Sequence, residues 1–187
     1  MNYTLEEKYN IIKEMVKEET SKNPITILKK LMHKDFINIH GPEHHFLDGA
    51  AFLVACKNAE GKIDIDDCLD ELAKRTMNMP GAMCGLWGVC GSSCSLGASL
   101  AIMNKTNPLS DNDYYRDNME YTSSVINKMS KIGGPRCCKR NAFLSIIAAA
   151  EFVKNKYNID LEINEVKCEF SPLNVQCIKE RCPFYNK

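Results

Sequence analysis

Apolar residues recur at helical spacing along most of this chain. Leu5, Tyr9, Ile12 and Val16 lie three or four positions apart, which predicts an amphipathic helix over about residues 4–20. We therefore predict a mainly α fold, a single-domain bundle of about six to seven helices. The further segments with this spacing begin near Pro24, Pro42, Asp64 or Asp66, Cys94, Ser110 and Cys138.

Caps and breakers mark the ends of several of these helices. Asn23 precedes a proline, a typical cap and first-turn pair, and Asp64 or Asp66 is expected to cap the fourth helix. Gly61 is expected to end the connection before it, and residues 133–135 (Gly-Gly-Pro) break the helix that precedes them. These signals divide the domain into an N-terminal helical pair (1–36) and a helical core (37–158).

The helix predicted over residues 138–157 is apolar around most of its circumference, so we expect it to be the central buried helix. The pattern then changes. Apolar residues alternate from Ile159 to Ile163, and again from Val166 to Phe170 with the parity shifted. This predicts a short strand with a bulge, or a small hairpin, within a cysteine-rich metal-binding tail (159–187).

Charge and composition narrow the classes of function. The 187 residues include 24 basic and 24 acidic groups, so the formal net charge is zero. Binding to nucleic acid or to a membrane surface requires a basic face, and we therefore expect neither. No signal peptide and no apolar run of ~20 residues is visible, which predicts a cytoplasmic protein with no membrane partner. The chain nevertheless has ten cysteines. In a reducing compartment, clustered cysteines are more often metal ligands or reactive thiols than disulfides.

The segment 81–97 holds five of the ten glycines and three of the ten cysteines. Glycines let backbone amides approach closely, and metal-bound sulfur needs N–H donors. The alternative is tight packing of small residues at a helix crossing, with cysteine as a small hydrophobe. The candidates are Cys84 and Cys90 as metal ligands and Gly85, Gly88 and Gly91 as cofactor-binding residues.

Two adjacent cysteines, Cys137 and Cys138, open a helix between cations. Helix N-terminal amides and Arg136, Lys139 and Arg140 would lower a thiol pKa, so we expect at least one thiolate at neutral pH. We assign Cys137, with Arg136, as the working thiol and Cys138 as a metal ligand. A vicinal disulfide and a solvated basic turn are the alternatives.

Three further cysteines lie in the tail, at Cys168, Cys177 and Cys182. The tail has little apolar material of its own, and metal ligation would order it. All three are therefore predicted as metal ligands. The chain has no CxxC pair, which weakens a zinc-ribbon or thioredoxin interpretation.

Three of the four histidines fall within residues 40–45, His-Gly-Pro-Glu-His-His. Glu43, His44 and His45 would stand at a helix N-terminus, which suits acid–base catalysis, metal ligation or an anion contact. Structural capping is the alternative. No Walker loop, GxGxxG, GxSxG or EF-hand loop is present, so nucleotide-driven and serine-hydrolase mechanisms lack support.

Together, HGPEHH, GAMCGLWGVCG, GGPRCCKR and the tail cysteines resemble an uncharacterised cysteine-rich family, a domain of unknown function, of anaerobic bacteria and methanogenic archaea. The resemblance runs from about His40 to Cys182. It implies relatives fused to methyltransferase-like domains, hence one-carbon or sulfur metabolism, although this chain has no methyltransferase motif. An anaerobic setting implies an oxygen-sensitive iron–sulfur cluster in preference to zinc.

We assign Cys94 to core packing, which leaves seven candidate cysteines in the three segments. Seven exceed the four thiolates of one [4Fe–4S] cluster, which predicts two metal sites, or one site and a working thiol. Our main hypothesis is an iron–sulfur enzyme for sulfur transfer, desulfuration or related redox chemistry. It would act on a small anionic or sulfur-containing substrate, with an electron donor or methyltransferase as partner. One alternative is a zinc- or cluster-stabilised accessory module, and another is a thiol redox protein using Cys137 and Cys138.

Overall fold

The computed structural model describes residues 3–60 and 62–186, and within them it is mainly helical, as predicted. Seven of its α-helices have nine or more residues, and the four-residue α5 was not predicted. Gly61 lies outside the described residues. The helices are α1 (Leu5–Lys17), α2 (Pro24–Met32), α3 (Glu43–Glu60), α4 (Ile65–Met77), α5 (Met83–Leu86), α6 (Gly91–Met103), α7 (Asp113–Ile132) and α8 (Cys138–Tyr157), with 3-10 helices η1 (Ser171–Leu173) and η2 (Lys179–Arg181).

The predicted caps account for several helix ends. The Asn23 side chain accepts hydrogen bonds from the Ile25 and Thr26 amides at 2.9 and 3.2 Å. Asp64 accepts one from the Asp67 amide at 3.3 Å. Each cap satisfies amides that have no partner within the helix. The predicted start and end of α8 are confirmed, whereas α7 begins three residues later than Ser110.

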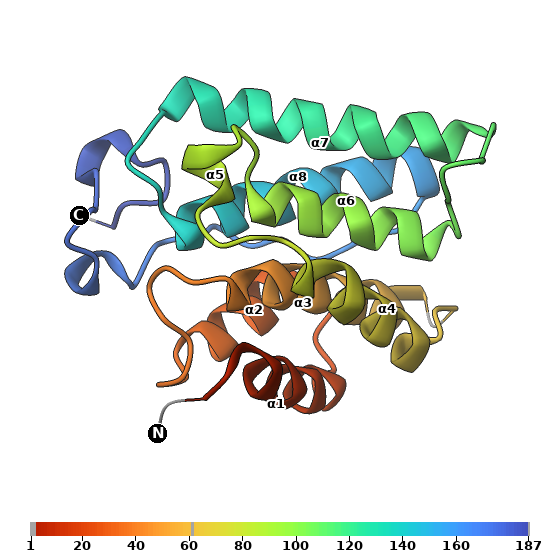
Figure 1. Ribbon diagram of the computed structural model, residues 1–187, viewed down its shortest axis with the longest axis horizontal. Coiled ribbons are helices and arrows are strands. Elements are labelled where there is room, and N and C mark those ends of the chain that lie inside the picture. Colours follow the sequence, from red (N-terminus) through yellow and green to blue (C-terminus); the bar gives the residue numbers. More distant parts are fainter. Residues whose placement is uncertain (1–2, 61, 187) are drawn as a thin grey trace.

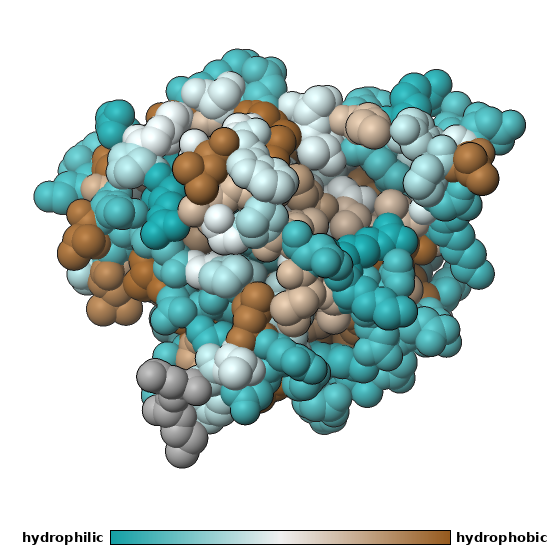
Figure 2. All heavy atoms as spheres, in the orientation of Figure 1, coloured by the Kyte–Doolittle hydropathy of each residue, from teal (hydrophilic) through white to brown (hydrophobic). Residues whose placement is uncertain are grey.

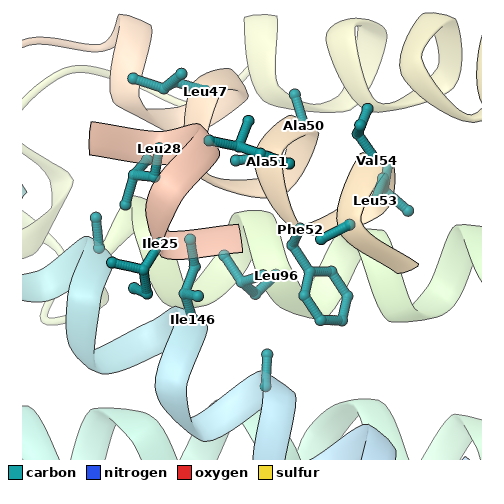
Figure 3. Close-up of a cluster of buried hydrophobic side chains, with 14 of the residues drawn as sticks. Ile25, Leu28, Leu47, Ala50, Ala51, Phe52, Leu53, Val54, Leu96 and Ile146 are labelled. Atoms are coloured by element: carbon teal, nitrogen blue, oxygen red, sulfur yellow. The ribbon is translucent and has the colours of Figure 1, made fainter. Parts of the chain in front are cut away.

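The helices form two layers, with α1–α4 on one side and α6–α8 on the other (Figure 1). Helix α3 belongs to the first layer and faces the second. It packs against α1, α2, α4, α6 and α8. It is buried on every side from Glu43 to Cys56. The prediction that α8 is the central helix is therefore wrong, because α8 leaves Glu151 and Lys154 exposed. Figure 3 shows the apolar contact of α3 with α2, α6 and α8.

The tail after α8 contains no strand within the described residues, so the predicted strand or hairpin is wrong. The alternating apolar residues are instead the ones that pack against the core. Leu161 is buried, and Ile159 and Ile163 pack partly buried against the core. Within the described residues, no second strand pairs with this segment. An isolated β-bridge joins Cys168 to Tyr185 further along the tail. Figure 1 shows that the tail runs back along the bundle from the end of α8 and that its later part lies at the end where α8 begins.

The surface is mixed in character. Figure 2 shows polar side chains over most of the face in view, with smaller apolar areas between them. None of the helices in the described part of the chain has the length and apolarity needed to cross a bilayer.

Helices α3 and α6 approach each other closely because small residues meet at their crossing. The Gly49 amide donates a hydrogen bond to Ser95 Oγ at 3.1 Å. A Cβ at Gly49 would lie 2.6 Å from the Oγ atoms of both Ser95 and Ser99. At the start of α6, a Cβ at Gly91 would lie 2.2 Å from the His45 ring. Glycine is therefore required at both positions, as the small-residue alternative for segment 81–97 predicted for Gly91.

We expect Gly49→Val to lower the free energy of unfolding by about 2–3 kcal/mol, because the larger side chain overpacks the crossing. Gly85→Val is the matched control, since a Cβ there meets nothing within 4 Å and the expected loss is under about 1 kcal/mol. Equilibrium urea unfolding at matched metal content measures both. Equal losses for the two variants would contradict the close crossing.

Candidate functional site

A cavity of about 260 Å³ lies between the start of α3, the α5 segment and the start of α8. It brings together three of the sequence motifs, which come from distant parts of the chain. The predicted site residues that line it are His44, His45, Cys84, Cys90, Gly91, Arg136, Cys137 and Cys138.

The first turns of α3 carry the polar wall of this cavity. His44 and His45 are buried, and Asp48, one turn further on, is 0% exposed. His44 Nδ1 lies 3.7 Å from Asp48 Oδ1, and neither carboxylate oxygen of Asp48 has a hydrogen-bond partner. Sequence reasoning missed Asp48. Its signal is a lone acid within an apolar helix, four positions after a histidine.

His45 packs over Gly91, and its Nδ1 has no hydrogen-bond partner. Burial lowers the pKa of His45, while the charge of Asp48 and a hydrogen bond with the Met79 backbone act in the opposite direction. A lowered pKa favours the neutral imidazole at pH 7. His45 therefore offers the cavity an uncharged ring.

Two thiols of this cavity, Cys90 and Cys138, have a raised pKa. Burial raises the pKa of Cys138 to about 12, and it also raises the pKa of Cys90. Asn141 Nδ2 donates to Cys90 Sγ at 3.3 Å. At least one thiolate was predicted for the pair Cys137 and Cys138, and Cys138 is not that thiolate, because desolvation dominates its pKa.

Glu43, predicted as a proton carrier, does not line this cavity. Its carboxylate accepts a hydrogen bond from the Asn38 amide at 2.8 Å and pairs with Lys8 at 3.3 Å. Burial acts to raise the pKa of Glu43, but backbone hydrogen bonds and the charges of His44 and Lys8 lower it overall. Glu43 thus anchors the start of α3.

The predicted cations after the cysteine pair are buried, so the alternative of a solvated turn is wrong. Lys139 is 1% exposed, and its Nζ donates to the Asn38 carbonyl at 3.1 Å and lies 3.3 Å from His44 Nε2. Arg140 is 5% exposed and donates to the carbonyls of residues 133 and 135. Neither cation forms an ion pair with a carboxylate of the described residues.

A second pocket adjoins the cavity and is bordered by four cysteines, Cys137 and the tail residues Cys168, Cys177 and Cys182. Burial raises the pKa of Cys168, and negative charge on the other three would raise it further, which places the four thiols near one another. Cys137 lines both the pocket and the cavity. The tail trio therefore gathers with Cys137, whereas Cys138 faces the histidines.

Each of these four sulfurs has an N–H donor. The Arg140 amide donates to Cys137 Sγ at 3.4 Å, and the Lys179 amide donates to Cys177 Sγ at 3.4 Å. Cys168 and Cys182 each have a backbone hydrogen bond from the residue two positions later. Amides directed at sulfur are the usual second shell of metal-bound thiolates.

The remaining predictions have a mixed outcome. Gly85 and Gly88 border a separate surface groove, and a Cβ at either would meet nothing within 4 Å. Within residues 3–60 and 62–186, no three histidine, cysteine, aspartate or glutamate side chains form a group that could hold a metal ion. The metal and cofactor assignments therefore stay predictions.

His40 and Asn174, which sequence reasoning did not single out, connect the tail to the start of α8. His40 Nε2 lies 3.1 Å from Asn174 Oδ1, and its Nδ1 accepts a hydrogen bond from the Cys138 amide at 3.5 Å. Asn174 Nδ2 lies 3.6 Å from Cys137 Sγ, at donor distance for sulfur. Both residues therefore help to hold the two cysteines toward their separate pockets.

Comparison with known proteins agrees with the predicted resemblance. No curated protein and no solved structure gives a significant match. A family model described as a family of unknown function, DUF5714, matches residues 12–185. The match covers nearly the whole chain, including both pockets and all four motifs. The chain therefore belongs to the DUF5714 family.

Proposed function

We propose that this protein is an iron–sulfur enzyme in which Cys137, Cys168, Cys177 and Cys182 bind a [4Fe–4S] cluster beside a substrate cavity. The observation that carries the proposal is the four-cysteine pocket, where every sulfur has an N–H donor and two buried cations stand close by. Four thiols with this support are a donor set that suits an iron–sulfur cluster.

The buried cations support negative charge in the four-cysteine pocket. Lys139 and Arg140 both line it and have no carboxylate partner among the described residues. A buried charge without a counter-charge is costly. Metal-bound thiolates would supply that charge. Because burial raises the pKa of Cys168 and Cys182, metal binding would also release protons from them.

Four thiolates suit either an iron–sulfur cluster or a zinc ion. A zinc ion draws four ligands onto one centre, whereas a cluster binds one thiolate at each of its irons and so spaces them more widely. The four sulfurs border one pocket, and the anaerobic setting that the family resemblance implies favours the cluster. A zinc-stabilised module is the alternative that metal analysis separates.

The adjoining cavity supplies the protein groups for chemistry on a small substrate. A bound cluster, with a thiolate on each of its four irons, would supply or accept electrons for redox chemistry on that substrate. Cys138 is a neutral thiol in this cavity, so its role is to donate a proton or hydrogen bond rather than to attack as a thiolate. His45 can accept a proton at its free Nδ1.

We expect anaerobically purified protein to contain about four irons and four sulfides per chain and to absorb near 400 nm, in keeping with one four-iron cluster. Cys177→Ser and Cys182→Ser should each lose most of this iron, because each removes one ligand. Cys68→Ser is the matched control, since Cys68 is half-buried on α4 outside both pockets, and it should keep the iron.

The metal content of the protein and its variants distinguishes the alternatives. Stoichiometric zinc in a colourless protein would replace the cluster by a zinc centre. Absence of both metals after anaerobic reconstitution would leave only the thiol redox alternative. Iron retained in the tail variants but lost in Cys84→Ser or Cys90→Ser would move the centre to the cavity.

We expect Cys138 to resist alkylation at pH 8, because a thiol with a pKa of about 12 has almost no thiolate there. Its rate of modification by iodoacetamide should rise about tenfold per pH unit between pH 8 and 11. Peptide mass mapping of metal-free protein, with glutathione in the same tube as reference, measures that rate. Modification as fast as glutathione at pH 7 would favour a reactive thiolate and the thiol redox alternative.

A further inference from the structure

We infer that the cavity binds its ligand through a positively charged nitrogen, an ammonium or amidinium group, that pairs with Asp48. This assignment rests on the proposed function for placing the substrate in the cavity, and it adds the chemical class of that substrate. No sequence motif pointed to Asp48, which is recognisable as a candidate only in the folded chain.

The carboxylate of Asp48 is buried without a hydrogen-bond donor. Asp48 is 0% exposed and lines the cavity, yet neither of its oxygens has a hydrogen-bond partner. Burying a carboxylate without donors is costly, and native interiors satisfy such groups almost always. A ligand with N–H donors would complete it.

The cations near Asp48 are engaged elsewhere. Lys139 Nζ donates to the Asn38 carbonyl and lies 3.3 Å from His44 Nε2. Its charge acts on Asp48 from a distance, with neither a hydrogen bond nor an ion pair between the two side chains. His44 Nδ1, at 3.7 Å, is beyond hydrogen-bond distance. Arg136 lines the cavity but is exposed, and Arg140 donates to backbone carbonyls. The missing donor must therefore come from the ligand.

The remaining walls define the rest of the ligand. His44 Nδ1 and His45 Nδ1 are two further buried polar atoms without a hydrogen-bond partner at this cavity. A wholly anionic ligand is disfavoured, because it would stand against a buried carboxylate. A carboxylate at the far end of the ligand could pair with Arg136. About 260 Å³ limits the ligand to a small amine or zwitterion.

Three small probes of similar size test the charge preference: ethanolamine, ethylene glycol and glycolate, which are cationic, neutral and anionic at pH 7. Ligand-observed NMR titration of the full chain measures binding of each. We expect ethanolamine to bind about tenfold or more tightly than the other two, the gain of a charged hydrogen bond. Equal binding of the three, or tighter binding of glycolate, would overturn the inference.

Two variants locate that preference. Asp48→Asn keeps the shape of the side chain and should abolish the preference for ethanolamine. Asp117→Asn is the matched control, because Asp117 is also buried but pairs with Lys156 and Tyr157 away from the cavity, and it should keep the preference. Circular dichroism confirms the fold of both variants. A preference that survives in folded Asp48→Asn would refute the role of Asp48.

Metal content measured on the same samples separates this inference from the proposed function. Preference for ethanolamine in a protein that binds no iron would keep the Asp48 site and remove the cluster. An iron-containing protein without any preference would keep the cluster and remove the Asp48 site.

Discussion

The close crossing of α3 and α6 is the constraint on which the rest of the structure depends. Gly49 allows the two helices to approach, and Gly91 leaves the space that the His45 ring occupies. Because α3 is then covered by five neighbours, its polar side chains have no route to solvent. They can lie only in a cavity or against one another. The cavity and its buried histidines thus follow from packing.

The first turn of α8 divides the chemistry between two pockets. Cys137 is the N-cap residue of α8, with an extended backbone, and Cys138 is the first residue of the helix, so the two side chains leave the chain in different directions. Cys137 therefore joins the tail thiols, whereas Cys138 and Asn141 face the histidines. The sequence predicted such a division, with Cys138 as the ligand and Cys137 as the working thiol. The proposed function gives the ligand role to Cys137 instead, because Cys137 borders the tail pocket. The two pockets adjoin at Cys137, which lines both of them.

Local signals explain what could be predicted, and long-range contacts explain what could not. Caps such as Asn23 and Asp64 act within one helical turn, so they can be recognised in sequence. The alternation after Ile159 predicted a strand wrongly, because it marks buried positions, whereas a strand also needs a neighbour that no local pattern supplies. The histidine, glycine-rich and double-cysteine motifs can be recognised locally, but only the folded chain shows that they line one cavity. Asp48 was missed, because an acid in a helix normally marks the solvent face.

Lys139 makes the two pockets a single structural unit. Its ammonium lies 4.9 Å from the centre of the Phe170 ring in the tail and 3.3 Å from His44 Nε2 at the cavity wall. A buried ammonium keeps such contacts because it has few other partners. Any change that orders the tail around its cysteines, metal binding included, would hold Phe170 over Lys139 and so hold His44 beside Asp48. Lys139 therefore connects the metal-ligating role proposed for the tail with the ligand-binding role proposed for α3. From the sequence alone, Lys139 was only one cation of a basic turn.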